Sequence, residues 1–544
     1  GHIYAMGMLA NNEWREGWLD EGLISFQTSW FQERVMPGAD VWTGSEMRVL
    51  DLDLRGISEP VVQPAEYFSS QGIYSTMIYT KASLIFRMLR DMVGEEAFRR
   101  VLNVYFQRYH FSHVDEEAFQ AVAEEVLRME LDWFFGQWLH ATGTVEYGIG
   151  EVEVEEDARG GFRTRVTLER KGRMTMPVPL RLEGDGEVRD TVVPGWATLH
   201  THVIRTGWRP QSVQVDPDGT ILDWNGLNDH WPRRPWGNPS IVRSLDDPFR
   251  PAPVSRNQLV CSFFPLVWYN DAGGFTLGFQ RRGNYMGSMK RALVRIGMPA
   301  FETGDKGGGA ERADYGSVYY RIQDPILLGR PRFGAEAEFF AGEGRAFGRL
   351  AYEWLLSAGL GSGPRRSLSL FSSVANVYDG TYLRAGRWEP EDHTLGEWGV
   401  GLRQTRGMPG GSLSWSLEGA GGVSSLDHRY FRGSLELGMR RSLPRRWSLE
   451  LRAAAAGAVG RDPETGDWKT GAVPRERRYF VGGGGAFEAL RNPFIRSAGA
   501  PMEEVGFIPG GGNLRGVDPL RSVGGFLALN LDLVSGEMAL GPLG

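Results

Sequence analysis

The second half of this 544-residue chain is built from short alternating segments, one after another, from about residue 258 to the end. In FLALNLDLV (526–534), leucines at every second position alternate with Ala, Asn and Asp. GSLSWSLEG (411–419) and RGSLELGMRR (432–441) alternate in the same way. A period of two predicts β-strands that have one apolar and one polar face. Over so long a stretch, it restricts this half of the chain to a large sheet.

Three features favour a transmembrane β-barrel for this region. The alternating segments are about 9–12 residues long, which is the length of a barrel strand. Gly, Ser and Ala alternate with Leu and Trp, as expected for a polar lumen and a lipid-facing wall. No helical pattern interrupts the series. We therefore predict an antiparallel transmembrane β-barrel of the outer-membrane type, incomplete within this chain, over residues 258–544. The alternative is a soluble β-solenoid or double sandwich.

The remainder of the chain divides into three regions. Residues 1–145 show helical periodicity and no strand pattern, as in STMIYTKASLIFRMLRDMVG (75–94). Residues 146–228 alternate with a period of two between turn signals, which predicts a small β-sandwich. Residues 229–257 are rich in Pro and Arg, and we predict that they form a linker.

The composition excludes several classes of protein. A formal net charge of −7 gives no basis for binding nucleic acid. Cys261 is the only cysteine, which rules out an internal disulfide framework and cysteine-ligated zinc. No run of about 18 apolar residues predicts a membrane-spanning helix. The chain starts at Gly1 without an initiating methionine and already in an amphipathic pattern, so we expect that a segment precedes it.

The start of the chain holds a histidine and a glutamate in a pattern that suits a metal. Eighteen residues separate His2 from Glu21. EWREGWLDEGLISF (13–26) predicts a helix on which Gly17 and Ser25 lie one turn from Glu21, so that small groups flank its carboxylate. Two histidines four residues apart on a helix can share one Zn²⁺, and a glutamate from the next helix supplies a third ligand. The fourth position is then left for water.

This pattern resembles the zinc motif of the gluzincin peptidases of the alanyl-aminopeptidase and leukotriene-hydrolase type: His-Glu-x-x-His, eighteen residues, then Glu within W-L-x-E-G. The resemblance implies that residues 1–145 are the α-helical half of a thermolysin-like catalytic domain with one catalytic zinc. It implies that His2 and Glu21 are zinc ligands and that the first histidine and the general-base glutamate precede Gly1. On that basis we expect this chain alone to be inactive.

Two later stretches resemble the same family. YSTMIYTKAS (74–83) is similar to its Tyr-x₄-Tyr-x-Lys-Gly stretch, with Ala82 in place of the glycine. The similarity implies that Tyr79 donates a hydrogen bond to the oxyanion of the tetrahedral intermediate and that Tyr74 contacts substrate. WFFGQWLHATGTV (133–145) resembles the segment that closes the catalytic domain, except that valine replaces the usual final proline. Aminopeptidase rather than endopeptidase action is implied by the family alone, because its Gly-x-Met-Glu-Asn loop is not in the chain.

The C-terminal region is similar in part to bacterial surface-antigen barrels, which assemble or secrete proteins. RRYFVGGGGAF (477–487) and GGGNLRGVDP (510–519) carry this similarity. It implies that Arg515 lies on a loop inside the lumen and pairs with a carboxylate of the wall; an ordinary turn arginine is the alternative. A soluble domain before such a barrel is expected to face the periplasm, which makes outer-membrane lipid a partner.

We therefore predict a zinc-dependent, aminopeptidase-like peptidase that hydrolyses peptides and is tethered to a bacterial outer membrane. The alternative from another class is an inactive peptidase-like module that serves a barrel for protein transport or assembly. A third possibility is a wholly soluble enzyme with a β-rich C-terminal domain. His200 and His202 fall on one face of a predicted strand, where two histidines can bind metal, but no third ligand lies nearby in sequence.

Overall fold

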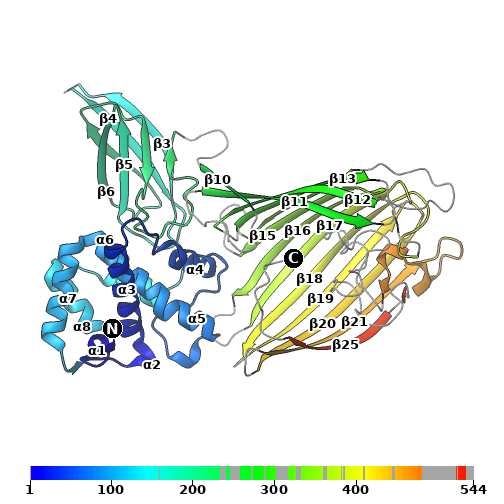
Figure 1. Ribbon diagram of the computed structural model, residues 1–544, viewed down its shortest axis with the longest axis horizontal. Coiled ribbons are helices and arrows are strands. Elements are labelled where there is room, and N and C mark those ends of the chain that lie inside the picture. Colours follow the sequence, from blue (N-terminus) through cyan, green and yellow to red (C-terminus); the bar gives the residue numbers. More distant parts are fainter. Residues whose placement is uncertain are drawn as a thin grey trace. The chain divides into compact units, whose positions relative to one another are not determined.

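The computed structural model of the protein describes residues 2–158, 160–232, 240–245, 258–270, 274–286, 289–301, 316–325, 332–358, 364–380, 383, 386–408, 411–443, 447–480, 522–523 and 525–534. The chain divides into two compact units. The first is Gly1–Val242 with two short later segments, and the second holds most of the remainder. Figure 1 shows helices and a small sandwich in the first unit, and one large sheet in the second.

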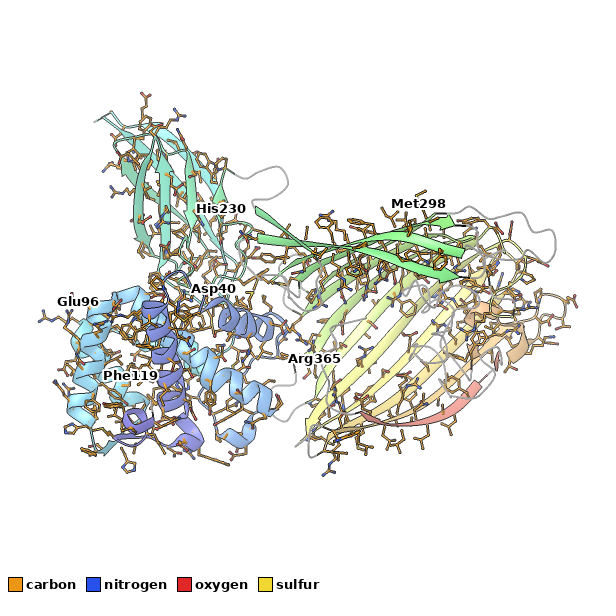
Figure 2. All side chains as sticks on the ribbon, in the orientation of Figure 1. Asp40, Glu96, Phe119, His230, Met298 and Arg365 are labelled. Carbon is orange, nitrogen blue, oxygen red and sulfur yellow. The ribbon has the colours of Figure 1, made fainter. Side chains whose placement is uncertain are left out.

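The helical part of the first unit is built around an aromatic core. Its helices are α1 (His2–Ala5), α2 (Glu13–Glu16), η1 (Trp18–Gly22), α3 (Leu23–Val35), α4 (Thr43–Leu54), η2 (Ala65–Tyr67), α5 (Gln71–Ser75), η3 (Thr76–Lys81), α6 (Ala82–Val93), α7 (Glu95–Tyr109), α8 (Glu116–Leu127) and α9 (Asp132–His140). Trp18 stacks on Phe86 at 5.4 Å, and Phe119 meets both rings edge-on. Figure 2 shows Phe119 in the interior of this helical part. Burying such rings is the main stabilising contribution here.

Local signals set the ends of these helices. Gly94 caps the end of α6, and its φ of +86° is a conformation that glycine adopts without strain. Asp115 caps the start of α8, and its carboxylate accepts a hydrogen bond from the Ala118 amide. Within the described ranges, every helix is too short or too polar to cross a membrane.

Our prediction of no strands in this region was wrong in one place. β1 (Leu9–Ala10) and β2 (Ser112–His113) form a parallel pair of two residues each. Strands this short leave no periodic signal in a sequence.

Residues after α9 form two facing sheets, as expected for a sandwich. One sheet has the order β3-β4-β7, and the other has the order β6-β5-β8-β9. Their strands are β3 (Tyr147–Glu156), β4 (Phe162–Arg170), β5 (Val178–Gly184), β6 (Glu187–Val193), β7 (Leu199–Thr206), β8 (Ser212–Val215) and β9 (His230–Trp231). On β5, Val178, Leu180 and Leu182 are buried and alternate with partly exposed residues. Gln137 of α9 holds this part to the helices, because its side chain bonds both the amide and the carbonyl of Thr175.

The second unit is dominated by a 14-stranded sheet, whose order is β10 through β22 with β25 also paired to β21. Its strands are β10 (Ser240–Leu245), β11 (Gln258–Asn270), β12 (Gly274–Tyr285), β13 (Met289–Phe301), β14 (Ser317–Asp324), β15 (Phe333–Gly342), β16 (Arg345–Ala358), β17 (Arg365–Val377), β18 (His393–Met408), β19 (Gly411–Ser424), β20 (Arg429–Ser442), β21 (Ser448–Arg461), β22 (Trp468–Lys469) and β25 (Gly525–Val534). A separate two-stranded sheet pairs β23 (Tyr479–Phe480) with β24 (Ser522–Val523). The range predicted as a linker, 229–257, contains β9 and β10.

The register of this sheet separates an apolar face from a polar face. One cross-strand row runs through Phe333, Trp354, Leu368, Leu402, Leu417, Leu435, Ala455 and Leu527. On β25, Leu527, Leu529 and Leu531 are 82%, 67% and 65% exposed, whereas Ala528 is buried. The predicted alternation of β25 is therefore confirmed.

The polar face carries ion pairs and a segment folded onto it. Glu397 accepts two hydrogen bonds from Arg432, at 2.8 and 2.9 Å, and one from the Tyr430 hydroxyl at 2.9 Å. Arg477, on the short helix η7 (Arg475–Arg477), lies 3.4 Å from the same carboxylate. The neighbouring Glu476 is buried and 2.6 Å from His393. These bonds fix the segment that follows β22 against the polar face.

We predicted that this region closes into a barrel. Each described strand from β10 to β21 pairs with the next one, and β25 pairs with β21. Among the described strands, no pairing joins the first strand, β10, to the last one, β25, which is the pairing that would close the sheet. The structure thus shows a large antiparallel sheet, and closure remains a prediction. The glycine runs 482–485 and 510–512 and the predicted lumen residue Arg515 lie outside the described residues.

Candidate metal and peptidase site

Two π-helical turns carry the two central residues of the predicted site. Glu21 lies in η1 and Tyr79 lies in η3, and both turns continue directly into α-helices. The turns pack closely at Gly22, where an added Cβ would overlap the Cβ of Ala82 and lie 3.3 Å from the Ile78 carbonyl oxygen. Only glycine permits this approach. The sequence predicted ordinary helices here. π turns are rare in proteins, and those that occur are frequently found at functional sites.

The structure brings His2, Glu21 and Tyr79 together around one carboxylate. His2 Nε2 lies 3.2 Å from Glu21 Oε2. The Tyr79 hydroxyl donates a 2.6 Å hydrogen bond to the other oxygen, Oε1. The side chains of His2 and Glu21 are 54% and 23% exposed, so solutes can reach the pair. Residues 58 positions apart in sequence thus share one small region, as the motif spacing predicts.

The surroundings keep the Tyr79 hydroxyl protonated. Its hydrogen bond to Glu21, together with burial, raises the pKa of Tyr79 far above its usual value. Burial first, and then the charge of Glu21, also raises the pKa of Tyr74. Tyr74 borders the site. A Cβ added to Gly17, which lies one helical turn before Glu21, would be 3.8 Å from the Tyr74 hydroxyl oxygen. Both phenols are therefore hydrogen-bond donors at neutral pH.

Asp20 supports the site, and sequence reasoning did not identify it. Its side chain is fully buried, and Oδ1 accepts a 3.0 Å hydrogen bond from Asn11 Nδ2. Oδ2 lies 3.8 Å from His2 Nδ1 and has no hydrogen-bond partner among the described residues. Burial raises the pKa of Asp20. Its only sequence signal is its position beside Glu21.

Lys81 is a second residue that sequence reasoning left without a role. It ends η3 and is fully buried, two positions after Tyr79. Its ammonium group donates to Asp53 Oδ1 at 3.1 Å and to Ser58 Oγ at 3.3 Å. Asp53 belongs to α4, so this ion pair fixes η3 to a neighbouring helix. A lysine in a helical pattern is normally exposed, which is why no sequence signal marked it.

The positions of His2 and Glu21 are compatible with two ligands of one zinc ion. The 3.2 Å between His2 Nε2 and Glu21 Oε2 matches the separation of about 3.3 Å between two ligand atoms on one tetrahedral zinc. Asp20 Oδ2 faces the other ring nitrogen of His2, where ligand histidines usually donate to an acceptor. In the described part of the chain, no three His, Cys, Asp or Glu side chains are placed together to hold a metal.

Comparison with known proteins relates this region to one peptidase family. Residues 2–138 match the model of the "Peptidase family M1 domain". We call residues 2–138 the M1 region. The chain is similar to aminopeptidase N of Caulobacter vibrioides, at 30% identity over 168 residues, covering 30% of this chain and 19% of that protein. It is also similar to human glutamyl aminopeptidase, at 28% identity over 151 residues, covering 26% of this chain and 15% of that protein.

The chain thus spans about a fifth or less of the length of these curated relatives. Among solved structures, aminopeptidase A of Legionella pneumophila in complex with aspartic acid matches 41% of this chain and 25% of its own. That match has 17% identity and a TM-score of 0.31. For residues 2–138, the match supports the predicted peptidase family. The roles of His2, Glu21, Tyr79 and Tyr74 remain predictions.

Proposed function

We propose that this chain belongs to a zinc-dependent, aminopeptidase-like peptidase, in which His2 and Glu21 are zinc ligands. The residues that complete the motif, a histidine and a general-base glutamate, are proposed to lie directly before Gly1. The observation that carries the proposal is the convergence of His2 Nε2 and the Tyr79 hydroxyl on the two oxygens of Glu21. The relatives of the M1 region, which are aminopeptidases, support peptides as the substrates.

When bound, zinc supplies a Lewis acid and lowers the pKa of a water molecule. The protein's own groups then have separate tasks. Glu21 Oε2 faces His2, while Oε1 is occupied by the Tyr79 hydroxyl. Tyr79 keeps its proton, so after leaving Glu21 it can donate to the oxygen on which negative charge develops. Lys81 fixes η3, and with it Tyr79, to α4 through its ion pair with Asp53.

We also propose that residues 258–544 form a barrel that tethers the peptidase to a bacterial outer membrane, with the peptidase facing the periplasm. The apolar row from Phe333 to Leu527 supports this proposal, because all its members are at least partly exposed and soluble proteins rarely expose large contiguous apolar surfaces. The opposite face carries Glu397, Arg432 and Ser373, as a polar lumen requires. Outer-membrane lipid is then a partner of the chain.

Hydrolysis of aminoacyl p-nitroanilides tests the peptidase proposal on the protein expressed from its complete reading frame. Glu21→Gln is expected to lower kcat/KM by at least about 10³-fold, since it removes a charged ligand. The matched control is Glu96→Gln, an exposed glutamate on α7 that Figure 2 shows at the surface. Equal loss in both variants, or none in either, would refute the proposal. A protein that never hydrolyses but still transports would support the inactive binding module.

The tether is tested by extraction from membranes. Full-length protein is expected to resist carbonate and urea washes and to enter solution only with detergent. It is also expected to run faster on gels when left unheated, as folded barrels do. Release by carbonate, with identical migration before and after heating, would support a soluble enzyme instead.

A further inference from the structure

Two histidines on the sandwich lie in direct contact, far in sequence from the peptidase motif. His200 and His202 are two positions apart on β7, and their ring centroids are 4.5 Å apart with the planes tilted by 52°. β7 ends the β3-β4-β7 sheet in the described part of the chain. His200 is exposed and His202 is 9% exposed, so one ring is open to solvent and the other lies beneath the surface.

The buried ring of His202 has a nitrogen that no neighbouring group satisfies. Its Nε2 is buried and has no hydrogen-bond partner among the described residues. A neutral imidazole carries a lone pair on one of its two nitrogens, and such a nitrogen is a common metal ligand.

The surroundings of the pair favour the neutral, ligating form. His200 pairs across the sheet with Leu168, and His202 pairs with Val166, both of which are buried. Burial, and then the proximity of His200, lower the pKa of His202. An unpartnered buried nitrogen is unfavourable, and a metal bond would remove that penalty.

We propose that His200 and His202 form a binding site for one divalent transition-metal ion, with Cu²⁺ bound more tightly than Ni²⁺ or Zn²⁺. Two imidazole nitrogens favour these ions over Ca²⁺ and Mg²⁺, which prefer oxygen ligands, and the ranking follows the general affinity order for nitrogen sites. His200 is exposed, so its ring can rotate to place a nitrogen beside His202 Nε2; water fills the other positions. The site is independent of His2 and Glu21.

Copper titration of the full chain in detergent tests the site, with electron paramagnetic resonance to count the nitrogen ligands. The chain has nine histidines, so each result is compared with His110→Ala, which removes an exposed histidine on a helix end. Wild type and His110→Ala are expected to bind one Cu²⁺ with two imidazole nitrogens. His200→Ala and His202→Leu are expected to weaken that binding at least tenfold.

His200→Ala keeps the test valid if His202→Leu disturbs the fold, because His200 is exposed. Unchanged affinity and an unchanged two-nitrogen signal in His200→Ala would overturn the proposal. Binding only at millimolar copper, equally in all variants, would identify an adventitious ion only and would also overturn it. Neither outcome depends on whether the peptidase site holds zinc.

Discussion

Replacing Gly22 by alanine tests whether the close contact between η1 and η3 builds the site. The added Cβ would overlap the Cβ of Ala82, well inside the roughly 3.5–4.0 Å at which carbon atoms pack. The Ile78 carbonyl, one turn before Ala82, is backbone and cannot move alone. We therefore expect η1 to shift by about 1 Å from η3. Overpacking is unfavourable by about 1–3 kcal/mol, and so close an overlap belongs in the upper part of that range, at about 2–3 kcal/mol. Alanine gains about 1 kcal/mol over glycine in a helix.

The net expectation for Gly22→Ala is a loss of about 1–2 kcal/mol in local stability. Hydrogen exchange with mass spectrometry, on the full chain, measures this directly. Amides of α3 and α6 are expected to exchange about 5–30-fold faster than in wild type. The control is Gly44→Ala in α4, where an added Cβ meets nothing within 4 Å, so exchange should be unchanged or slower. Equal exchange in Gly22→Ala and wild type would refute the close-contact argument.

Three further predictions concern single side chains. Lys81→Met should destabilise the helical part by about 3–5 kcal/mol because it leaves the Asp53 charge buried and unpaired, and Lys81→Met with Asp53→Leu should recover most of that loss in thermal melts. Burial raises the pKa of Asp223 to about 8, above the unfolded value of 3.8, so its contribution to stability is full below pH 3.8 and is lost as the pH rises through 8. Proteolysis of the sandwich should therefore accelerate from pH 5 to pH 8 in wild type and less so in Asp223→Asn. Tyr79→Phe, in the protein from the complete reading frame, should lower kcat about 10²–10³-fold with unchanged zinc content; an unchanged kcat would contradict the donor role.

The sequence was sufficient to predict three residues that meet at the site, but not their supporting residues or the backbone that brings them together. The resemblance to the peptidase motif pointed to His2, Glu21 and Tyr79, and the structure places His2 and Tyr79 each within hydrogen-bonding distance of Glu21. The π turns could not be predicted, because one extra residue in a helical turn leaves the apolar periodicity of the sequence almost unchanged. The buried role of Lys81 could not be predicted either, because its partner Asp53 is 28 positions away in the sequence.

The large sheet shows the same division between local and long-range information. Alternation along Gly525–Val534 predicted a strand and identified its exposed leucines, because side chains in a strand have a period of two. The pairing of Arg477 with Glu397 could not be predicted, since it joins residues 80 positions apart through a segment folded over the sheet. Whether the sheet closes depends on strand tilt and shear, which a single sequence does not encode in any local pattern.

The most direct test of the central claim, that His2 and Glu21 belong to a zinc peptidase motif, is the coding sequence immediately upstream of Gly1. The account predicts a histidine four positions before His2, followed at once by glutamate, since both imidazoles must lie on one helical face. Any other pair of residues at those two positions would contradict it. His2 and Glu21 would then lack a third ligand and a general base, and the peptidase proposal would fail.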